Sequence, residues 1–340
     1  MAEAWRVAEA APRGTACRSV CRADWLARAK RYRDSVRELF GHLSGQRLLD
    51  HPIANFFRNY YSFDPAQDVS VTRWSPGLGV ALEGVAPSEV GRILPEERPT
   101  LWCPSAEGIR LEIKGHRMAT AARLRRLRDS RDALALVWAR PPFFGCHGVH
   151  EWAMLYRGGP PHRERHQRLP MRVPQETVDR VVTGSCPLMC THYDAVRFYT
   201  PEARPMNRHR QLFDELGRGA EPLLEQPGCL HVAMDLFRAA RGLWPFLPSE
   251  DMADALRIAL RARALDMRAS PYDLRGVDPG RGSAALAERR PVRVETPEGR
   301  EEYAAGQRAI WLDAKGVAAR LLGRYEVALA EADVSAPGKK

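Results

Sequence analysis

Apolar residues recur every three or four positions along much of this chain. The first such run follows Asp24, a suitable helix N-cap, and its apolar members are Trp25, Leu26, Ala29, Tyr32, Val36, Leu39 and Phe40. This spacing places the apolar side chains on one face of a helix, with arginines between them. It therefore predicts a helix over residues 24–40 that packs against a core.

The same periodicity predicts further helices. A stripe of aromatic residues over 53–63 is typical of core packing and consists of Phe56, Phe57, Tyr60 and Tyr61. Prolines and capping residues set the other boundaries, because proline lacks the amide that a helix interior needs. These helices are expected over residues 111–139, in one piece or in two joined near Asp129, and over 147–157, 225–244, 249–265 and 297–329.

Alternating patterns typical of strands are few. The sequence thus predicts a mainly α fold, a helical domain with short β or irregular insertions near residues 67–108 and 170–200. Residues 24–330 are expected to form this single, mainly helical catalytic domain, in which 84–108 marks a candidate sub-boundary. We expect a loose N-terminal tail over residues 1–23 and a disordered tail over 331–340.

The chain is basic. Its 340 residues include 52 Lys and Arg against 42 Asp and Glu, and the net charge of +10 is carried mostly by arginine. Such a surface attracts polyanions, nucleic acid among them, although arginine-rich composition is also common in high-GC bacterial proteins. The predicted helix over 111–139 presents either a solvated face or a phosphate-contacting one. Its arginines are Arg117, Arg123, Arg125, Arg126, Arg128 and Arg131.

No run of about 18 or more apolar residues is present, and the first residues lack the apolar run of a signal peptide. We therefore expect a soluble, cytoplasmic protein with no membrane partner. Seven cysteines, an odd number spread over a long chain, do not form the pattern of a disulfide framework. They are expected to be reduced.

Three short stretches hold nearly every residue able to do chemistry. They are residues 145–152, 190–194 and 229–235, and each couples a histidine to a carboxylate within four positions among apolar or aromatic neighbours. A charged group removed from water there needs a partner, a metal or a reaction. If the stretches converge on one cavity they form a site. If they lie far apart, each histidine is an ordinary buried ring bonded to a backbone carbonyl.

A metal centre is one interpretation of these stretches. In the first and third stretches a histidine and a carboxylate lie four positions apart, which puts both on one face of a helix. In the second stretch they lie two positions apart. Bundle proteins bind iron or manganese with such inward-facing pairs. The ligand pool is His147, Glu151, His192, Asp194, His231 and Asp235. Zinc is the alternative metal, with Cys186, Cys190 and His192 in a spacing unlike the common Cys-x2-Cys knuckle.

The same residues support a metal-free interpretation that needs no cofactor. A carboxylate among apolar residues has a raised pKa and acts as a general acid or base, while a histidine orients or charges it. Hydrolysis of a glycosidic bond needs such a carboxylate and a donor for the leaving group. The candidates are Glu151, Asp194 and Asp235, with His150, His192 and His231 as their partners. Neighbouring aromatics that could sandwich a base are Phe143, Phe144, Trp152, Tyr156, Phe198 and Tyr199.

One charged pair lies outside the three stretches. Asp266 and Arg268 stand at the end of a predicted helix, where apolar residues would be expected. They form either a pair at the edge of the pocket or an ordinary salt bridge at a helix end.

Five runs carry a family resemblance. They are residues 150–154 (HEWAM), 191–198 (THYDAVRF), 226–231 (QPGCLH), 266–273 (DMRASPYD) and 295–300 (ETPEGR). Through them the chain resembles, over about residues 24–325, an actinobacterial family commonly labelled 3-methyladenine DNA glycosylase. The resemblance implies base excision repair, by hydrolysis of the N-glycosidic bond of an alkylated purine in DNA. The expected DNA contacts are Arg123, Arg126, Trp152, Tyr156 and Arg197.

Two other interpretations stay open. One is a helical-bundle, non-haem iron or manganese oxygenase that acts on a small molecule and uses the ligand pool above. The other is a non-enzymatic nucleic-acid-binding protein in which the histidine–carboxylate pairs are structural. Metal content distinguishes the oxygenase from the other two.

Overall fold

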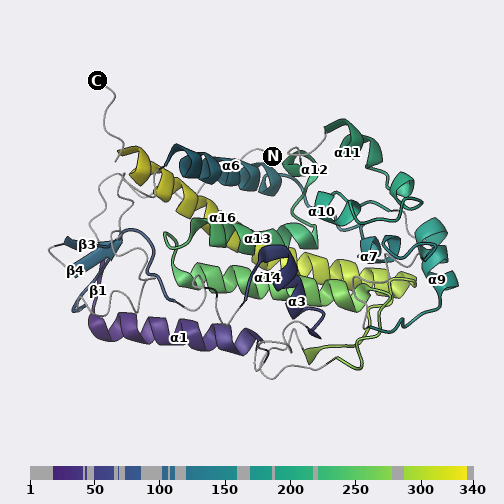
Figure 1. The fold of residues 1–340 in the computed structure, drawn as a ribbon, viewed down its shortest axis with the longest axis horizontal. Helices are drawn as coiled ribbons and strands as arrows, with labels where there is room; N and C mark the ends of the chain where they lie inside the picture. Colours follow the sequence, from purple (N-terminus) through teal and green to yellow (C-terminus); the bar gives the residue numbers. More distant parts are fainter. Residues whose placement is uncertain are drawn as a thin grey trace.

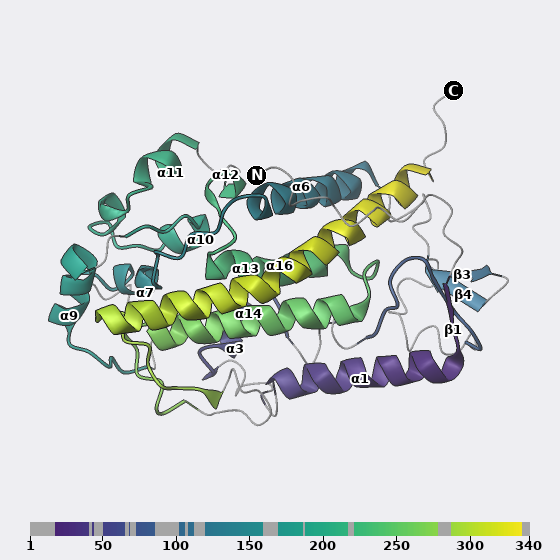
Figure 2. The ribbon, with the colours of Figure 1, turned by 180° about the vertical axis from the view of Figure 1, so that it is seen from behind.

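Four long helices form the centre of the molecule: α6 (Ala121–Trp138), α13 (Leu230–Leu243), α14 (Ser249–Ala269) and α16 (Pro297–Val334). In this computed structural model α13 packs against α14, and α16 contacts α6, α13 and α14, as Figure 1 and Figure 2 show. Helix α1 (Arg22–Phe40) packs against α14 on the side away from α6. The structure describes residues 18–40, 43, 50–64, 68, 73–85, 102–105, 108–111, 120–158, 169–185, 188–216, 221–277 and 287–334.

Helix α14 is buried over most of its length. Acidic residues occupy its first turn, where the helix dipole favours negative charge. One of them, Asp251, is 5% exposed and accepts hydrogen bonds from Arg320 at 2.7 Å and Arg324 at 3.0 Å, both on α16. These ion pairs align α14 with α16, and the apolar area between the helices supplies most of the stabilisation, at about 25 cal/mol per Å² buried.

The aromatic stripe belongs to the core, as predicted. It lies on α3 (Ala54–Tyr61), where Phe57 is fully buried between Phe40 of α1 and Phe237 of α13. Phe56 and Tyr61 of the same helix also line a small cavity between α3 and α13. The stripe thereby connects the hydrophobic core to the site described below.

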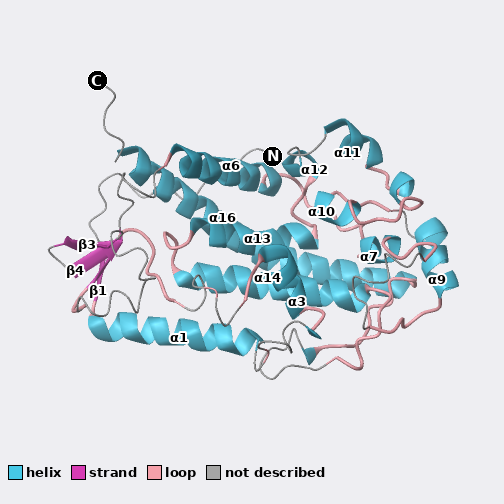
Figure 3. Ribbon diagram, viewed as in Figure 1, coloured by secondary structure: helices cyan, strands magenta, loops and turns pink. Residues whose placement is uncertain are grey.

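A four-stranded sheet stands at one end of the molecule, beside the start of α1 (Figure 3). Its order is β1 (Arg18–Val20), β2 (Val80–Leu82), β4 (Gly108–Leu111) and β3 (Trp102–Ser105). Strand β1 pairs in parallel with β2, β2 pairs antiparallel with β4, and β4 pairs antiparallel with β3. The fold is therefore mainly α with a short β insertion, as the sequence predicts.

Short helices gather at the end of the molecule away from the sheet (Figure 1). They are α7 (Val149–Ala153), α9 (Gln175–Arg180), the π-helix η3 (Val181–Ser185), α10 (Tyr193–Val196), the 3₁₀-helix η4 (Arg204–Met206), α11 (Arg210–Leu216) and α12 (Glu221–Leu224). The insertion expected near 170–200 is thus irregular and helical over its described residues, with an isolated β-bridge at Met171.

Several predicted boundaries are wrong. Residues 18–20, assigned to a loose tail, form β1, and α1 begins two residues before Asp24. Leu111, the expected start of a helix, belongs to β4, and α6 begins only after Thr120, whose hydroxyl accepts a hydrogen bond from the amide of Arg123 at 3.3 Å. Residues 1–17, 86–101, 112–119 with Arg117, and 335–340 lie outside the described residues.

Two predicted helices near the site are shorter than expected. The helix over 147–157 is reduced to α7, because Gly148 has a φ of 68° in the left-handed region. The helix expected from residue 225 begins at Leu230, because the preceding residues form a turn in which the amide of Cys229 donates to the carbonyl of Gln226 at 3.1 Å. Helix α16 runs past the predicted end at 329. Within the described part of the chain, no helix combines the length and apolar character needed to cross a bilayer.

Candidate functional site

The three histidine-bearing stretches converge at the N-terminal end of α13. His150 of α7, His231 of α13 and His192, which directly precedes α10, form a row of imidazole rings. The ring centroids of His150 and His231 are 4.7 Å apart, and those of His231 and His192 are 4.9 Å apart and nearly stacked. Convergence on one place, on which the site hypothesis depends, is therefore confirmed.

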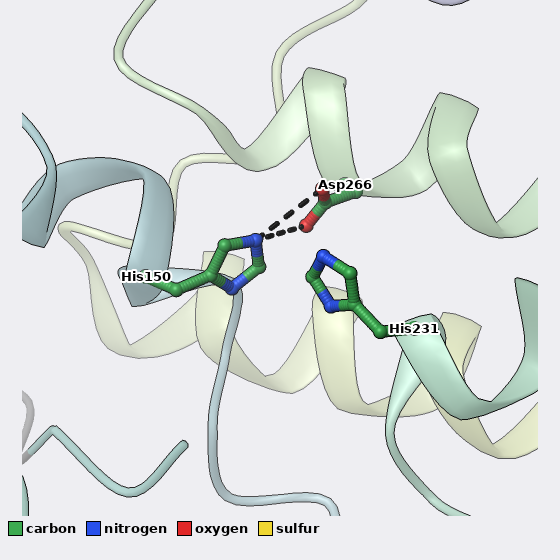
Figure 4. Close-up of side chains that lie close together, drawn as sticks. All are labelled: His150, His231 and Asp266. Carbon is green, nitrogen blue, oxygen red and sulfur yellow. Dashed lines mark hydrogen bonds and ion pairs between the residues drawn. The ribbon is translucent and has the colours of Figure 1, made fainter. Parts of the chain in front are cut away.

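Asp266 of α14 closes the inner end of this row. Its Oδ1 lies 3.1 Å from Nε2 of His150, and Figure 4 shows His231 facing the same carboxylate from α13. One ligand-type atom from each of His150, His231 and Asp266 lies within 4.8 Å of the others. Asp266 is fully buried, and His150 is 4% exposed. We call these three residues the inner triad.

Two carboxylates close the outer end of the row. Nε2 of His192 lies 3.2 Å from Oε1 of Glu225 and 3.2 Å from Oδ2 of Asp235. The three residues again offer ligand-type atoms within 4.8 Å of one another, and we call them the outer triad. The hydroxyl of Tyr61 donates to Oδ1 of Asp235 at 3.2 Å, and Arg238 forms an ion pair with that oxygen at 3.2 Å. The side chains of Glu225 and Asp235 are 14% and 25% exposed, so the outer triad reaches solvent.

Arg263 balances the charge behind the inner triad. Its Nη1 lies 2.8 Å from Oε1 of Glu151 and 2.7 Å from Oδ2 of Asp266, and its side chain is only 2% exposed. The guanidinium also lies over the ring of Phe56, 4.5 Å from its centroid. Glu151, predicted as an acid, base or metal ligand, therefore acts in this structure as the partner of a buried arginine and belongs to neither triad.

Besides Glu151, two predicted members of the site lie apart from the triads. His147 has a φ of 46° and precedes α7, so it does not share a helix face with Glu151; its ring packs 6.5 Å from that of Tyr303. Asp194 forms ion pairs with Arg197 at 3.0 Å and Arg238 at 3.5 Å at the mouth of the site.

The predicted zinc pattern finds little support among the described residues. Cys186 lies outside them, and Cys190 is buried with its thiol 3.8 Å from the backbone carbonyl of His192. His192 itself directs Nε2 at the outer carboxylates.

Sequence reasoning missed Glu225 and Arg263, and it paired Asp266 with Arg268, either at the pocket edge or as an ordinary salt bridge at a helix end. That pairing is wrong, because Arg268 instead contacts Glu302 at 3.4 Å. The sequence of α14 did contain a signal. Buried residues that follow one another every three or four positions share one face of this helix, and this series includes Met252, Leu256, Ala259, Arg263 and Asp266. Two charged residues that continue an apolar stripe indicate a buried ion pair. Glu225 offered no comparable signal.

Burial and neighbouring charge shift the pKa values along the row. Burial lowers the pKa of His231 well below its usual value, and the two flanking imidazoles lower it further. Burial also opposes protonation of His150 and His192, but the adjacent carboxylates outweigh it and raise the pKa of both rings. Burial raises the pKa of Glu225, whereas the hydrogen bond from His192 and the charge of Arg238 overcome burial and lower that of Asp235. The middle ring is thus neutral while both ends of the row favour protonation.

A cleft of about 520 Å³ gives access to the outer triad. Its polar side includes Asp194, Glu225, Asp235 and Arg238, and its apolar side comes from α6, with Leu134, Val137 and Trp138. A cavity of about 30 Å³ lies deeper, against His192 and His231, and shares Asp194, Asp235 and Arg238 with the cleft. A ligand in the cleft would therefore contact the outer carboxylates directly and reach the histidine row past Arg238.

Two of the expected DNA contacts are core residues. Trp152 is fully buried and donates through Nε1 to the carbonyl of Ala269 at 2.9 Å, and Tyr156 is 3% exposed, so neither can stack on a base. Arg123 is half-buried and lies 5.8 Å from the ring centroid of Phe246. Arg126 and Arg197 are exposed.

Comparisons of the chain with models of known protein families, with functionally curated proteins and with solved structures found no match. Interpretation of the site therefore depends on its own geometry.

Proposed function

We propose that this chain is a metal-dependent enzyme with a dinuclear centre, of the non-haem iron or manganese type, that acts on a small molecule as an oxygenase. The observation that carries the proposal is the pair of histidine–carboxylate triads, which adjoin through the stacked rings of His231 and His192. Together they offer three imidazoles and three carboxylates from five segments of a helical fold, with His231 and Asp235 both on α13. Bundle proteins assemble two-metal sites from inward-facing donors of this kind.

The spacing of the donor atoms supports this proposal. Metal–ligand bonds of about 2.0–2.2 Å place neighbouring ligands about 3.0 Å apart in an octahedral site and about 3.4 Å apart in a tetrahedral one. The separations in the two triads are 3.1 Å for His150 to Asp266, and 3.2 Å for His192 to Glu225 and to Asp235. These separations match those of neighbouring ligands around one cation, as well as those of hydrogen bonds.

The charges around the triads also support it. In the outer triad one imidazole nitrogen, which carries at most one proton, faces two carboxylates at 3.2 Å. A divalent ion among the three atoms would replace that proton and bind both carboxylates at once, with Arg238 still paired to Oδ1 of Asp235. In the inner triad, no described residue forms a hydrogen bond with the ring of His231, whose lowered pKa keeps it neutral as metal binding requires.

The donor types favour iron or manganese. No thiolate belongs to either triad, and two histidines with one carboxylate, the composition of the inner triad, are typical of non-haem iron oxygenases. Bound iron or manganese would supply redox and Lewis-acid chemistry. The protein would orient Asp235 through Tyr61 and Arg238, hold Asp266 through Arg263, and place the substrate against the apolar wall of α6.

Metal stoichiometry tests the proposal. We expect protein reconstituted without oxygen to hold about two equivalents of iron or manganese after gel filtration. Asp266→Asn should lose the inner ion, Asp235→Asn the outer ion, and His231→Ala at least one. Asp132→Asn, on α6 with a side chain 65% exposed, is the matched control and should keep both. Wild-type protein that holds no ion beyond the amount in a chelator-treated sample would refute the proposal.

A metal-free DNA glycosylase is the second candidate. The cleft favours it, because Asp194, Asp235 and the aromatic residue Trp138 line the same volume, as recognition of a base requires. In this candidate Asp235 assists departure of the base and His192 holds it ionised. Chelator-treated protein should then release alkylated purine from duplex DNA, and Asp235→Asn should abolish the release while Asp132→Asn preserves it. No release by pure protein at micromolar concentration would eliminate this candidate.

A further inference from the structure

A second cleft, of about 500 Å³, is distinct from the one that gives access to the outer triad. It is formed by the segment before α9, the end of α14, the loop that follows α14 and the segment that leads into α16. Five arginines line it, namely Arg172, Arg268, Arg275, Arg289 and Arg293, against two carboxylates. None of these residues belongs to the triads.

Part of this positive charge is held in fixed positions. Arg172 forms a bidentate pair with Glu295, at 2.6 Å and 2.9 Å, and its Nε donates to the carbonyl of Ser270 at 2.8 Å. Arg275 pairs with Asp273 through three contacts between 2.6 Å and 3.0 Å. These two pairs engage both lining carboxylates, so five guanidinium groups face two carboxylates and the lining carries a net positive charge.

The remaining arginines therefore leave the cleft electropositive. Arg268 donates to the carbonyl of Arg290 at 2.8 Å and contacts Glu302 only at 3.4 Å. Arg293 is exposed, and it forms no ion pair with a described residue. A concave surface with one sign of charge focuses the electrostatic potential and concentrates counter-ions. Guanidinium groups also match the geometry of phosphate oxygens, to which they bind in a bidentate manner.

The cleft is connected to the framework of the site. Arg172 lies over the ring of Trp152, 5.3 Å from its centroid, and Trp152 is anchored to the carbonyl of Ala269, three residues beyond Asp266 on α14. Arg172 and Glu295 thereby position one wall of the cleft relative to the buried helix. An anion bound there would meet one wall that is already held in place by the contacts of Arg172.

We propose that this arginine-lined cleft is a binding site for phosphate groups, carried either by a phosphorylated small molecule or by a nucleic-acid backbone. The inference is independent of the metal centre. It places part of the basic excess of the chain on a defined concave surface. From the sequence, the arginines of the helix now seen as α6 were expected to form either a solvated face or a phosphate-contacting one.

Two probes distinguish the sources of the phosphate. Pyrophosphate is titrated by calorimetry, and a fluorescein-labelled 20-mer duplex is titrated by anisotropy, both in dilute buffer without phosphate. Binding of pyrophosphate alone identifies a phosphorylated small molecule. Binding of the duplex, competed by pyrophosphate and weakening steeply with salt, identifies a nucleic-acid backbone. Either result supports the proposal if it depends on the cleft.

A charge-matched pair of variants tests that dependence. Arg275→Gln/Arg293→Gln removes two cleft arginines, and Arg257→Gln/Arg261→Gln removes two arginines from the exposed side of α14, both in surface ion pairs. We expect the cleft variant to weaken binding at least tenfold and the control less than twofold, with metal content unchanged in both. Absence of binding by either probe, or equal loss in the two variants, would overturn the proposal.

Discussion

Substitution of Arg263 tests the buried half of the site most directly. Its guanidinium is the shared partner of Glu151 at 2.8 Å and Asp266 at 2.7 Å, and both it and the two carboxylates are almost fully excluded from water. Arg263→Met keeps an unbranched apolar stem and removes the guanidinium with its charge. Asp266 then keeps its ion pair with His150 at 3.1 Å.

The expected loss of stability follows from burial. Removing one partner of a buried ion pair costs about 3–5 kcal/mol, because the remaining charge stays desolvated without compensation. The cation–π contact with Phe56 adds to this loss. We therefore expect Arg263→Met to lower the free energy of unfolding by about 4 kcal/mol, and Tm by roughly 8 °C at about 2 °C per kcal/mol for a long chain.

Chemical and thermal denaturation of chelator-treated protein measure this loss. Arg257→Met is the matched control, because it lies on the same helix, its side chain is 44% exposed, and its ion pair with Asp254 is a surface pair of the kind that contributes about 0–1 kcal/mol. Glu151→Gln combined with Arg263→Met should recover part of the loss, since one buried charge is then neutralised. If Arg263→Met were no less stable than Arg257→Met, the charges would not form the buried network described here.

Two further predictions concern proton linkage and close packing. The affinity for Mn²⁺ should weaken as pH falls from about 8 to about 5.5. The raised pKa values of His150 and His192 keep both rings protonated to higher pH, and the ion must displace those protons. An affinity that does not change over this pH range would contradict the prediction. Gly299→Ala should destabilise the protein by about 1–3 kcal/mol, because a Cβ there would stand 1.8 Å from the carbonyl oxygen of Arg293. Gly323→Ala, on the same helix with open space around it, should instead raise the free energy of unfolding by up to about 1 kcal/mol. Equal Tm values for the two variants would show this reasoning to be wrong.

Local patterns were sufficient for most helices. The periodic apolar residues of α1 and the capping and proline signals at the starts of α14 and α16 correspond to helices in the structure. These signals succeed because helix formation and the choice of its buried face depend on residues within a few turns of one another. They fail at α7, where Gly148 takes a left-handed conformation and shortens the helix to five residues.

Chain pattern alone could not decide which aromatic and basic residues face outward. Trp152 and Tyr156 looked suited to contact a base, but both are core residues. The arginines of α6 attracted attention because they are close in sequence, whereas the arginine-lined cleft draws on four separate segments. Proximity along the chain is a poor guide where a surface is built from several elements.

By itself, the sequence determined the helical character of the protein and singled out His150, His192, His231 and Asp235 as candidate site residues, which the structure brings together. Only the tertiary structure decided how they combine. Packing of α13 against α14 brings Asp266 to His150 and His231, and the turn before α13 brings Glu225 to His192. Helix periodicity is a property of neighbouring residues, but a donor set is a property of distances between elements, and those distances are set by the packing of side chains remote in sequence.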